Sequence, residues 1–195
     1  MRRSRTVFLL AALCLVAASA ASAAAQASRQ YVQGQVVGIG GRRAGLNRSF
    51  SLTINSYTSA GEVQRLNDAL RSGGQDELLS VLSKLNAGRV SIGNDVGVRA
   101  NAVIATPAAE GGTKLTVIYE REVAIFERRY GTRSQDYRFG YAEIYLDARG
   151  RGQGTFIPAA KVKLEGDNNW VVEDFGEFPA RLMGLRSSGR VGGAR

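Results

Sequence analysis

The alternation of apolar and polar residues constrains the fold of this chain more than any other feature. Phe50, Leu52 and Ile54 alternate with small polar residues, and the same period of two recurs over residues 142–146. Such a period puts the apolar side chains on one face of a β-strand. Further segments with strand-like patterns are Tyr31–Ile39, Val90–Ile92, Val96–Ile104, Leu115–Tyr119, Val123–Ile125, Gly152–Leu164, Trp170–Val172 and Phe178–Leu185. The sequence therefore predicts an antiparallel sheet as the main element.

Between residues 59 and 88 the pattern changes to helical spacing. Ser59 and Glu62 have the spacing of a capping box, in which the serine accepts from the first turn and the glutamate reaches back. Apolar residues at helical spacing follow, and Gly73–Gly74 is predicted to end the helix. A second amphipathic helix is predicted to start near Gln75. These two segments predict a helical hairpin packed on the sheet.

Together the segments predict an α+β domain, in which a curved or nearly closed antiparallel β-sheet of about seven to nine strands carries a helical hairpin inserted after the second strand. A tight turn is predicted at Asp147–Gly150. Pro158 indicates a bulge or an edge strand, because proline cannot donate to a sheet ladder. We expect a single domain over residues 28–186 and a disordered tail over 187–195.

Residues 1–27 have the pattern of a secretory signal peptide. Arginines precede a short apolar run, and small residues allow cleavage after Ala25 or Ala27. The run is too short to span a bilayer comfortably, and no later segment is long and apolar enough to do so. We therefore expect an exported protein, periplasmic or extracellular, with no transmembrane segment in the mature chain.

The composition excludes much of the chemistry open to other domains. The chain has no histidine, and its one cysteine, Cys14, lies within the leader. We therefore expect no disulfide, no transition-metal site and no cofactor in the mature domain. Lysine and arginine exceed acidic residues by 26 to 17, for a net charge of +9. Because the basic residues occur in short pairs separated by acids, they do not predict a nucleic-acid-binding stripe.

Carboxylates are the remaining candidates for catalysis or metal binding. Glu173, Asp174 and Glu177 could hold Ca²⁺ through oxygen ligands, but their spacing matches no known loop, and we interpret them as a solvated strand end. Two carboxylates at the right separation suffice for glycoside hydrolysis. A carboxylate-based hydrolase therefore stays an alternative, although the sequence singles out no catalytic, cofactor-binding or metal-binding residue.

Aromatic residues recur on one face of the strand that precedes the Asp147 turn. This face carries Tyr137, Phe139, Tyr141 and Tyr145, with Arg138 and Glu143 nearby. Tyrosine offers a flat apolar area with a polar tip, which suits stacking on a sugar or a peptide. The other interpretation is that this face packs beneath the predicted helices. The candidate partner-contact face consists of Tyr137, Arg138, Tyr141 and Tyr145.

The C-terminal half resembles a known group of proteins, and Gly152–Lys161 is the most specific part of the resemblance. The other matching segments are Gly73–Leu78, Asp136–Gly140, Glu143–Asp147, Val172–Gly176 and Pro179–Leu182. The chain is similar in these segments to a group of small exported bacterial (acidobacteria-like) proteins of unassigned function. The resemblance implies a bacterial, exported, single-domain protein and implies no catalytic or binding residue.

These observations favour an exported, non-enzymatic binding domain. Its expected partner is an unknown protein or envelope component and not a nucleic acid. The first alternative is the carboxylate-based hydrolase acting on an extracellular polymer. A further alternative is a carrier of a small apolar ligand, which requires the sheet to close around an apolar cavity instead of a packed core.

Overall fold

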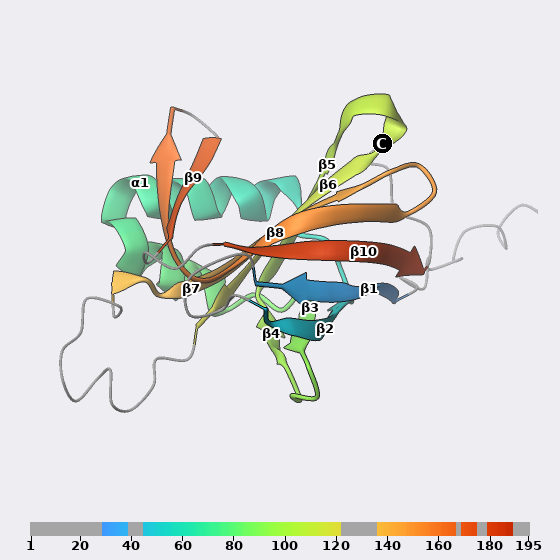
Figure 1. Cartoon of the computed structure of the whole chain (residues 1–195). Coiled ribbons are helices and arrows are strands. Elements are labelled where there is room, and N and C mark those ends of the chain that lie inside the picture. The colour runs from blue at the N-terminus through green and yellow to red at the C-terminus, as the bar shows by residue number, and fades with distance from the viewer. Residues whose placement is uncertain (1–28, 39–44, 122–135, 167–168, 175–178, 189–195) are drawn as a thin grey trace, which may run out of the picture.

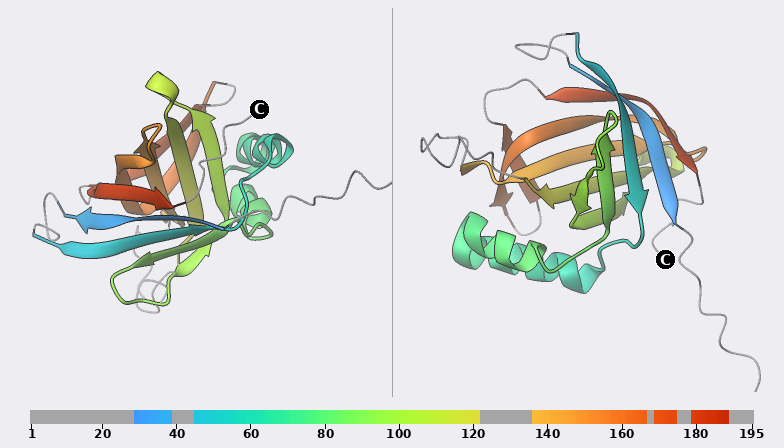
Figure 2. Two further views of the ribbon diagram at one scale, coloured as in Figure 1. Left: turned by 90° about the vertical axis from the view of Figure 1, so that its right-hand side faces the viewer. Right: turned by 90° about the horizontal axis from the view of Figure 1, so that it is seen from below.

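The computed structural model describes residues 29–38, 45–121, 136–166, 169–174 and 179–188. Its main element is one large antiparallel sheet of ten strands (Figure 1). Nine of them follow the order β4-β3-β2-β1-β10-β8-β7-β6-β5, and β9 pairs with β8 outside this path. The sheet curves strongly but does not close (Figure 2). The α+β, sheet-dominated prediction is confirmed.

The strands follow one another with a single long helix after the second. They are β1 (Gln30–Val37), β2 (Asn47–Ile54), β3 (Gly88–Ile92), β4 (Val98–Ala100), β5 (Ala102–Pro107), β6 (Thr113–Glu120), β7 (Phe139–Leu146), β8 (Arg151–Glu165), β9 (Asn169–Asp174) and β10 (Ala180–Ser188). A short 3-10 helix, η2 (Ala109–Gly111), joins β5 to β6. β10 extends two residues into the segment predicted as a tail.

The predicted helical hairpin is wrong, because residues 59–88 form one α-helix, α1 (Ala60–Leu82), and the described ranges contain no second α-helix. The glycine pair kinks the helix instead of separating two helices. Gly74 alone leaves the helical region, with φ 63° and ψ −141°, a conformation that glycine adopts without a Cβ penalty. The capping box is confirmed: Ser59 Oγ accepts from the Glu62 amide, and Glu62 Oε2 accepts from the Ser59 amide at 2.7 Å.

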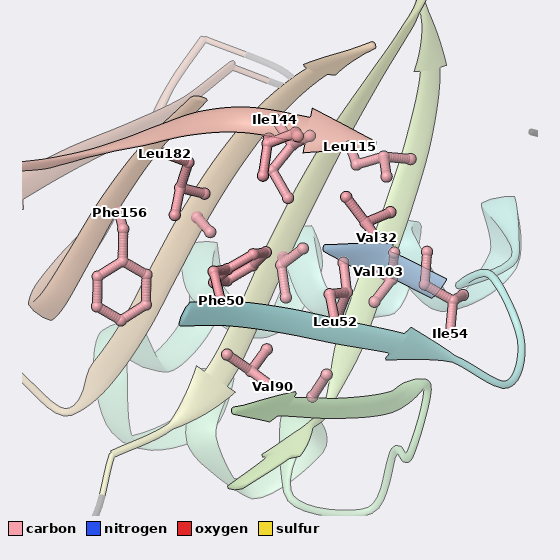
Figure 3. Close-up of a cluster of buried hydrophobic side chains, with 14 of the residues drawn as sticks. Val32, Phe50, Leu52, Ile54, Val90, Val103, Leu115, Ile144, Phe156 and Leu182 are labelled. Atoms are coloured by element: carbon pink, nitrogen blue, oxygen red, sulfur yellow. The ribbon is translucent and has the colours of Figure 1, made fainter. Parts of the chain in front are cut away.

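The inner face of the curved sheet holds the larger apolar core (Figure 3). Side chains from β1, β2 and β3 point toward those from β5, β6, β7, β8 and β10. Alternation along each strand supplies this face, as the sequence predicts. The buried members include Val32, Val36, Phe50, Leu52, Ile54, Val90, Val103, Leu115, Val117, Ala142, Ile144, Leu146, Phe156, Leu182 and Leu185.

A second apolar core lies between α1 and the outer face of the sheet. Leu66, Leu70, Leu78 and Leu82 of the helix belong to the same buried cluster as residues of β6, β7 and β8. The strand members are Ala102 of β5 together with Ile118, Phe139, Tyr141, Ile157, Ala160 and Val162. Part of the sheet is therefore apolar on both faces, and α1 covers only that part.

Polar side chains fix α1 on the sheet. Trp170 Nε1 donates to Asn67 Oδ1 at 2.6 Å. The Gln75 amide, next to the kink, accepts from the Val162 backbone N–H at 3.2 Å and also donates to the Val162 carbonyl. The β7–β8 pairing ends two residues earlier, at Ala160. Gln75 thus satisfies backbone groups that would otherwise be unpaired at a buried edge.

β8 changes its inner and outer faces at a bulge. The register with β7 shifts by one residue between Ile157 and Ala160, around Pro158, so the bulge predicted from this proline is confirmed. Phe156 faces the inner core, whereas Ala160 and Val162 face α1. On its other edge β8 pairs with β10 as far as Phe156 and with β9 from Ala160 onward.

The segment Val96–Ile104, predicted as one strand, contains two strands at opposite ends of the sheet order. β4 ends at Ala100 and β5 begins at Ala102, with only the buried Asn101 between them. The first and last strands of the nine-stranded path are therefore joined by one residue. This connection requires the strong curvature of the sheet.

None of the helical segments in the described ranges has both the length and the apolar character that a membrane span requires. The predicted leader, the segment Val123–Ile125 and residues 189–195 lie outside those ranges.

We predict that Leu146→Ala lowers the free energy of unfolding by about 2–5 kcal/mol, because truncating a buried leucine loses transfer energy and leaves a cavity. Leu146 is 2% exposed within the inner core. Urea unfolding measures the change. Val171→Ala, at a residue that is 38% exposed, serves as the control and should cost less than about 1 kcal/mol. Equal losses in both variants would contradict the assignment of the inner face.

Candidate functional site

A polar cluster on the outer face of β6 and β7 is the candidate site. Glu143 accepts from the Tyr141 hydroxyl at 2.9 Å through Oε2 and from the Tyr145 hydroxyl through Oε1. Lys114 Nζ lies 3.2 Å from Glu143 Oε1. We call Lys114, Tyr141, Glu143 and Tyr145 the Glu143 cluster. One carboxylate thus orients two phenols and one ammonium group.

Local structure explains why these side chains meet. Tyr141, Glu143 and Tyr145 alternate with inward-facing residues of β7, and the register places Lys114 directly opposite Tyr145. α1 covers Tyr141, which is 5% exposed, but not Tyr145, which is 46% exposed. The Lys114 ammonium lies 5.7 Å from the centroid of the Tyr145 ring, within range of a cation–π interaction. The cluster therefore runs from beneath the helix to the solvent.

The electrostatics of the cluster fix its protonation state. Partial burial would raise the pKa of Glu143, but hydrogen bonds from Tyr145, Tyr141 and Lys114 outweigh burial and lower that pKa below its ordinary value. Burial, followed by the charge of Glu143, raises the pKa of Tyr141. The hydrogen bond to Glu143 raises the pKa of Tyr145. At neutral pH the phenols are neutral donors, and neither acts as a base.

An open hollow of about 620 Å³ adjoins Tyr145 at the end of the β7–β8 hairpin. It is lined by Ala108, Ala109, Tyr145, Leu146, Asp147, Arg151, Gly152 and Gln153. Asp147, predicted to start a turn, accepts from the Arg149 and Arg151 amides at 2.9 and 2.8 Å. The hollow therefore combines an exposed aromatic ring, an amide and a guanidinium on a rigid hairpin.

Glu173 belongs to a separate ion-pair group. Tyr137 donates to Glu173 Oε1 at 2.7 Å, and Lys163 Nζ lies 2.7 Å from Oε2. The hydrogen bonds from Lys163 and Tyr137 lower the pKa of Glu173 to about 2. Within the described ranges, no three acidic side chains gather as a metal site would require. Glu177, part of the Ca²⁺ interpretation, lies outside those ranges.

The structure divides the four predicted partner-contact residues. Tyr137 is buried and bonded to Glu173, and Arg138 pairs with Asp76 of α1. Tyr141 lies beneath α1, so the interpretation that this face packs under a helix applies to Tyr141. Only Tyr145 presents its ring to solvent. Sequence reasoning missed Lys114, because only the β6–β7 register brings it to the cluster.

Most of the other carboxylates with a known partner have a structural role. Glu62 caps α1, Asp68 pairs with Arg71, and Asp76 pairs with Arg138. Asp147 holds its own hairpin, as described above. These groups are spread over the surface and do not face one another across the hollow, whose lining contains a single carboxylate.

Comparison with known proteins adds neither a family nor an activity. No protein-family model matches the chain, and no curated protein and no solved structure matches it either. The resemblance of Gly152–Lys161 and its neighbouring segments to exported bacterial proteins therefore stays a prediction. The Glu143 cluster and the surface around it remain as the features that indicate a function.

We predict that Glu143→Gln lowers the pKa of both Tyr145 and Tyr141, because the negative charge that disfavours the phenolates is removed. Tyr141 should stay above its ordinary pKa, since burial is the larger cause of its shift. Alkaline titration of carbon-13-labelled tyrosine rings by NMR measures both values.

The same shifts predict alkaline instability. A tyrosine whose folded pKa is raised contributes stability that is present below its unfolded pKa of about 10 and is lost as pH rises through the folded value. Glu173→Gln, which touches Tyr137 instead, is the matched control and should leave the Tyr145 titration unchanged. An unchanged Tyr145 titration in Glu143→Gln would contradict the assigned hydrogen bond.

Proposed function

We propose that this chain is an exported binding domain that contacts an envelope component around Tyr145. The observation that carries the proposal is an exposed aromatic ring held in place by Glu143 and Lys114 beside an open hollow. A ring with a fixed orientation loses little conformational freedom on binding, which favours affinity. Neighbouring Gln153 and Arg151 add polar contacts, as binding sites that combine aromatic and polar groups do.

Export is supported by the leader pattern of residues 1–27 and by the resemblance to exported bacterial proteins. An envelope component is then the ligand that the mature domain encounters. The absence of histidine from the chain and the position of its one cysteine in the leader remove two common catalytic side chains from the mature domain. A binding role makes no use of either.

The distribution of carboxylates supports binding over hydrolysis. A glycosidase needs two carboxyl groups on either side of the scissile bond. The hollow is lined by one, Asp147, which accepts two backbone N–H groups of its own turn. Glu143 is nearest to it in the chain, but Lys114 and two phenols occupy its oxygens. Neither group is free to act as a general acid.

The packed inner core supports a surface site over a carrier. A carrier of an apolar ligand needs an apolar cavity. Here the inner face of the sheet is filled by side chains that meet one another, among them Phe50, Phe156 and Leu182 (Figure 3). A partner would therefore bind on the outer surface.

We predict that the protein, secreted with its leader and shown by intact mass to begin after Ala25 or Ala27, cosediments with bacterial envelope fragments. Tyr145→Ala should weaken this binding about tenfold, since loss of one well-packed aromatic contact costs about 1.4 kcal/mol. Sedimentation over a series of fragment concentrations gives the affinity.

Val171→Ala removes another exposed hydrophobic side chain, on β9 and away from the hollow, and is the matched control. It should bind as the unmodified protein does. Failure of the unmodified protein to cosediment, or equal binding by Tyr145→Ala, would overturn the proposed role of this site. Retention of the leader in a cytosolic product would overturn export.

A further inference from the structure

The outer side of β1, β10 and the first half of β8 forms a surface to which these strands contribute no carboxylate. Tyr31 and Met183 are exposed among its polar side chains. β1 and β10 contain no aspartate or glutamate, and β8 contains none before Glu165. We call this surface the arginine face, and its exposed polar members include Gln33, Gln35, Arg151, Gln153, Arg181 and Arg186. Both views in Figure 2 place α1 away from β1 and β10, so the helix leaves this face open.

The fold gathers arginines that are far apart in the sequence. The register places Arg186 of β10 directly opposite Arg151 of β8 and opposite Gln33 of β1. A register shift at Gly184, whose φ is 61°, lets Arg181 and Arg186 both face outward although they are five residues apart. The pairs of basic residues in the sequence do not reveal this cluster, because strand pairing creates it.

The positive charges of the arginine face are poorly compensated. Arg151 has Asp147 at 3.4 Å. Within the described ranges, the side chains of Arg181 and Arg186 have no hydrogen bond or ion pair. Like charges directly opposite each other across a β ladder are destabilising. The sheet therefore retains an electrostatic repulsion between Arg186 and Arg151 that an anionic ligand would relieve.

We infer that the arginine face binds an acidic polysaccharide. This inference rests on the proposed function and names the chemical class of the ligand. Guanidinium groups hold carboxylates and sulfates through two parallel hydrogen bonds. The amides of Gln33, Gln35 and Gln153 can bond sugar hydroxyls between the charged groups. Tyr145 lies directly opposite Gln153, so its exposed ring borders the same surface and can stack on a sugar.

The test uses affinity electrophoresis of the mature protein in gels that contain alginate, a polymer of uronic acids, or uncharged dextran. Alginate should retard the unmodified protein, and dextran should not. The double variant Arg181→Gln/Arg186→Gln should bind alginate at least about tenfold more weakly. The control Arg65→Gln/Arg71→Gln removes the same charge from α1. It should weaken alginate binding less than about twofold, far less than the tenfold loss, equal to about 1.4 kcal/mol, expected for Arg181→Gln/Arg186→Gln.

Equal loss in the two double variants would overturn the inference, since net charge alone would then explain binding. Equal retardation by single-stranded poly(dT) would overturn the polysaccharide class. Arg186→Lys keeps the positive charge at an exposed position but loses the guanidinium group, so it should weaken alginate binding. This single variant tests the inference even if the double variant misfolds. Unchanged alginate binding by Arg186→Lys would contradict the inference. If the double variant still cosediments with envelope fragments although it no longer binds alginate more tightly than dextran, the inference that the envelope ligand is an acidic polysaccharide is overturned. The proposed function around Tyr145 then remains intact.

Discussion

Asn101 joins β4 to β5, the two ends of the strand order, and its side chain holds this junction against β6 and the end of α1. The curvature of the sheet depends on these contacts. Asn101 is 3% exposed. Its Oδ1 accepts from the Glu120 amide of β6 at 2.9 Å, and its Nδ2 donates to the carbonyls of Leu82 and Leu85 at 3.1 and 3.4 Å. A buried amide must satisfy its donors and acceptors. Asn101 does so only where the end of α1, β4 and β6 converge, and the sheet curves to bring them there.

This curvature creates two different faces. The inner face is a filled apolar core, so a ligand can contact only the outer face. There α1 covers β6, β7 and part of β8, and the bulge at Pro158 turns the second half of β8 toward the helix. The Glu143 cluster lies where helix coverage ends, and the arginine face extends from it across β10 to β1. The candidate binding surface is thus the outer area that α1 leaves open.

Local patterns in the sequence predict the local structure well. Alternation predicts the strands, the Ser59 capping box predicts the helix start, and Pro158 predicts the bulge. Two local patterns mislead: Gly74 kinks one helix instead of ending it, and Asn101 divides a continuous alternating segment between opposite ends of the sheet. The site is less predictable, because the approach of Lys114 to Tyr145 and of Arg186 to Arg151 depends on registers between distant segments.

The most direct test is the free energy of unfolding of Asn101→Ala in urea. The substitution removes the partner of the Glu120 amide and of the Leu85 carbonyl, and one of the two donors to the Leu82 carbonyl. We predict a loss of about 2–4 kcal/mol, as expected when buried polar groups are left unsatisfied. Asn86→Ala, at an exposed position near the end of the same helix, should change stability by less than about 0.5 kcal/mol. An equally small change in Asn101→Ala would contradict the central role given to this residue.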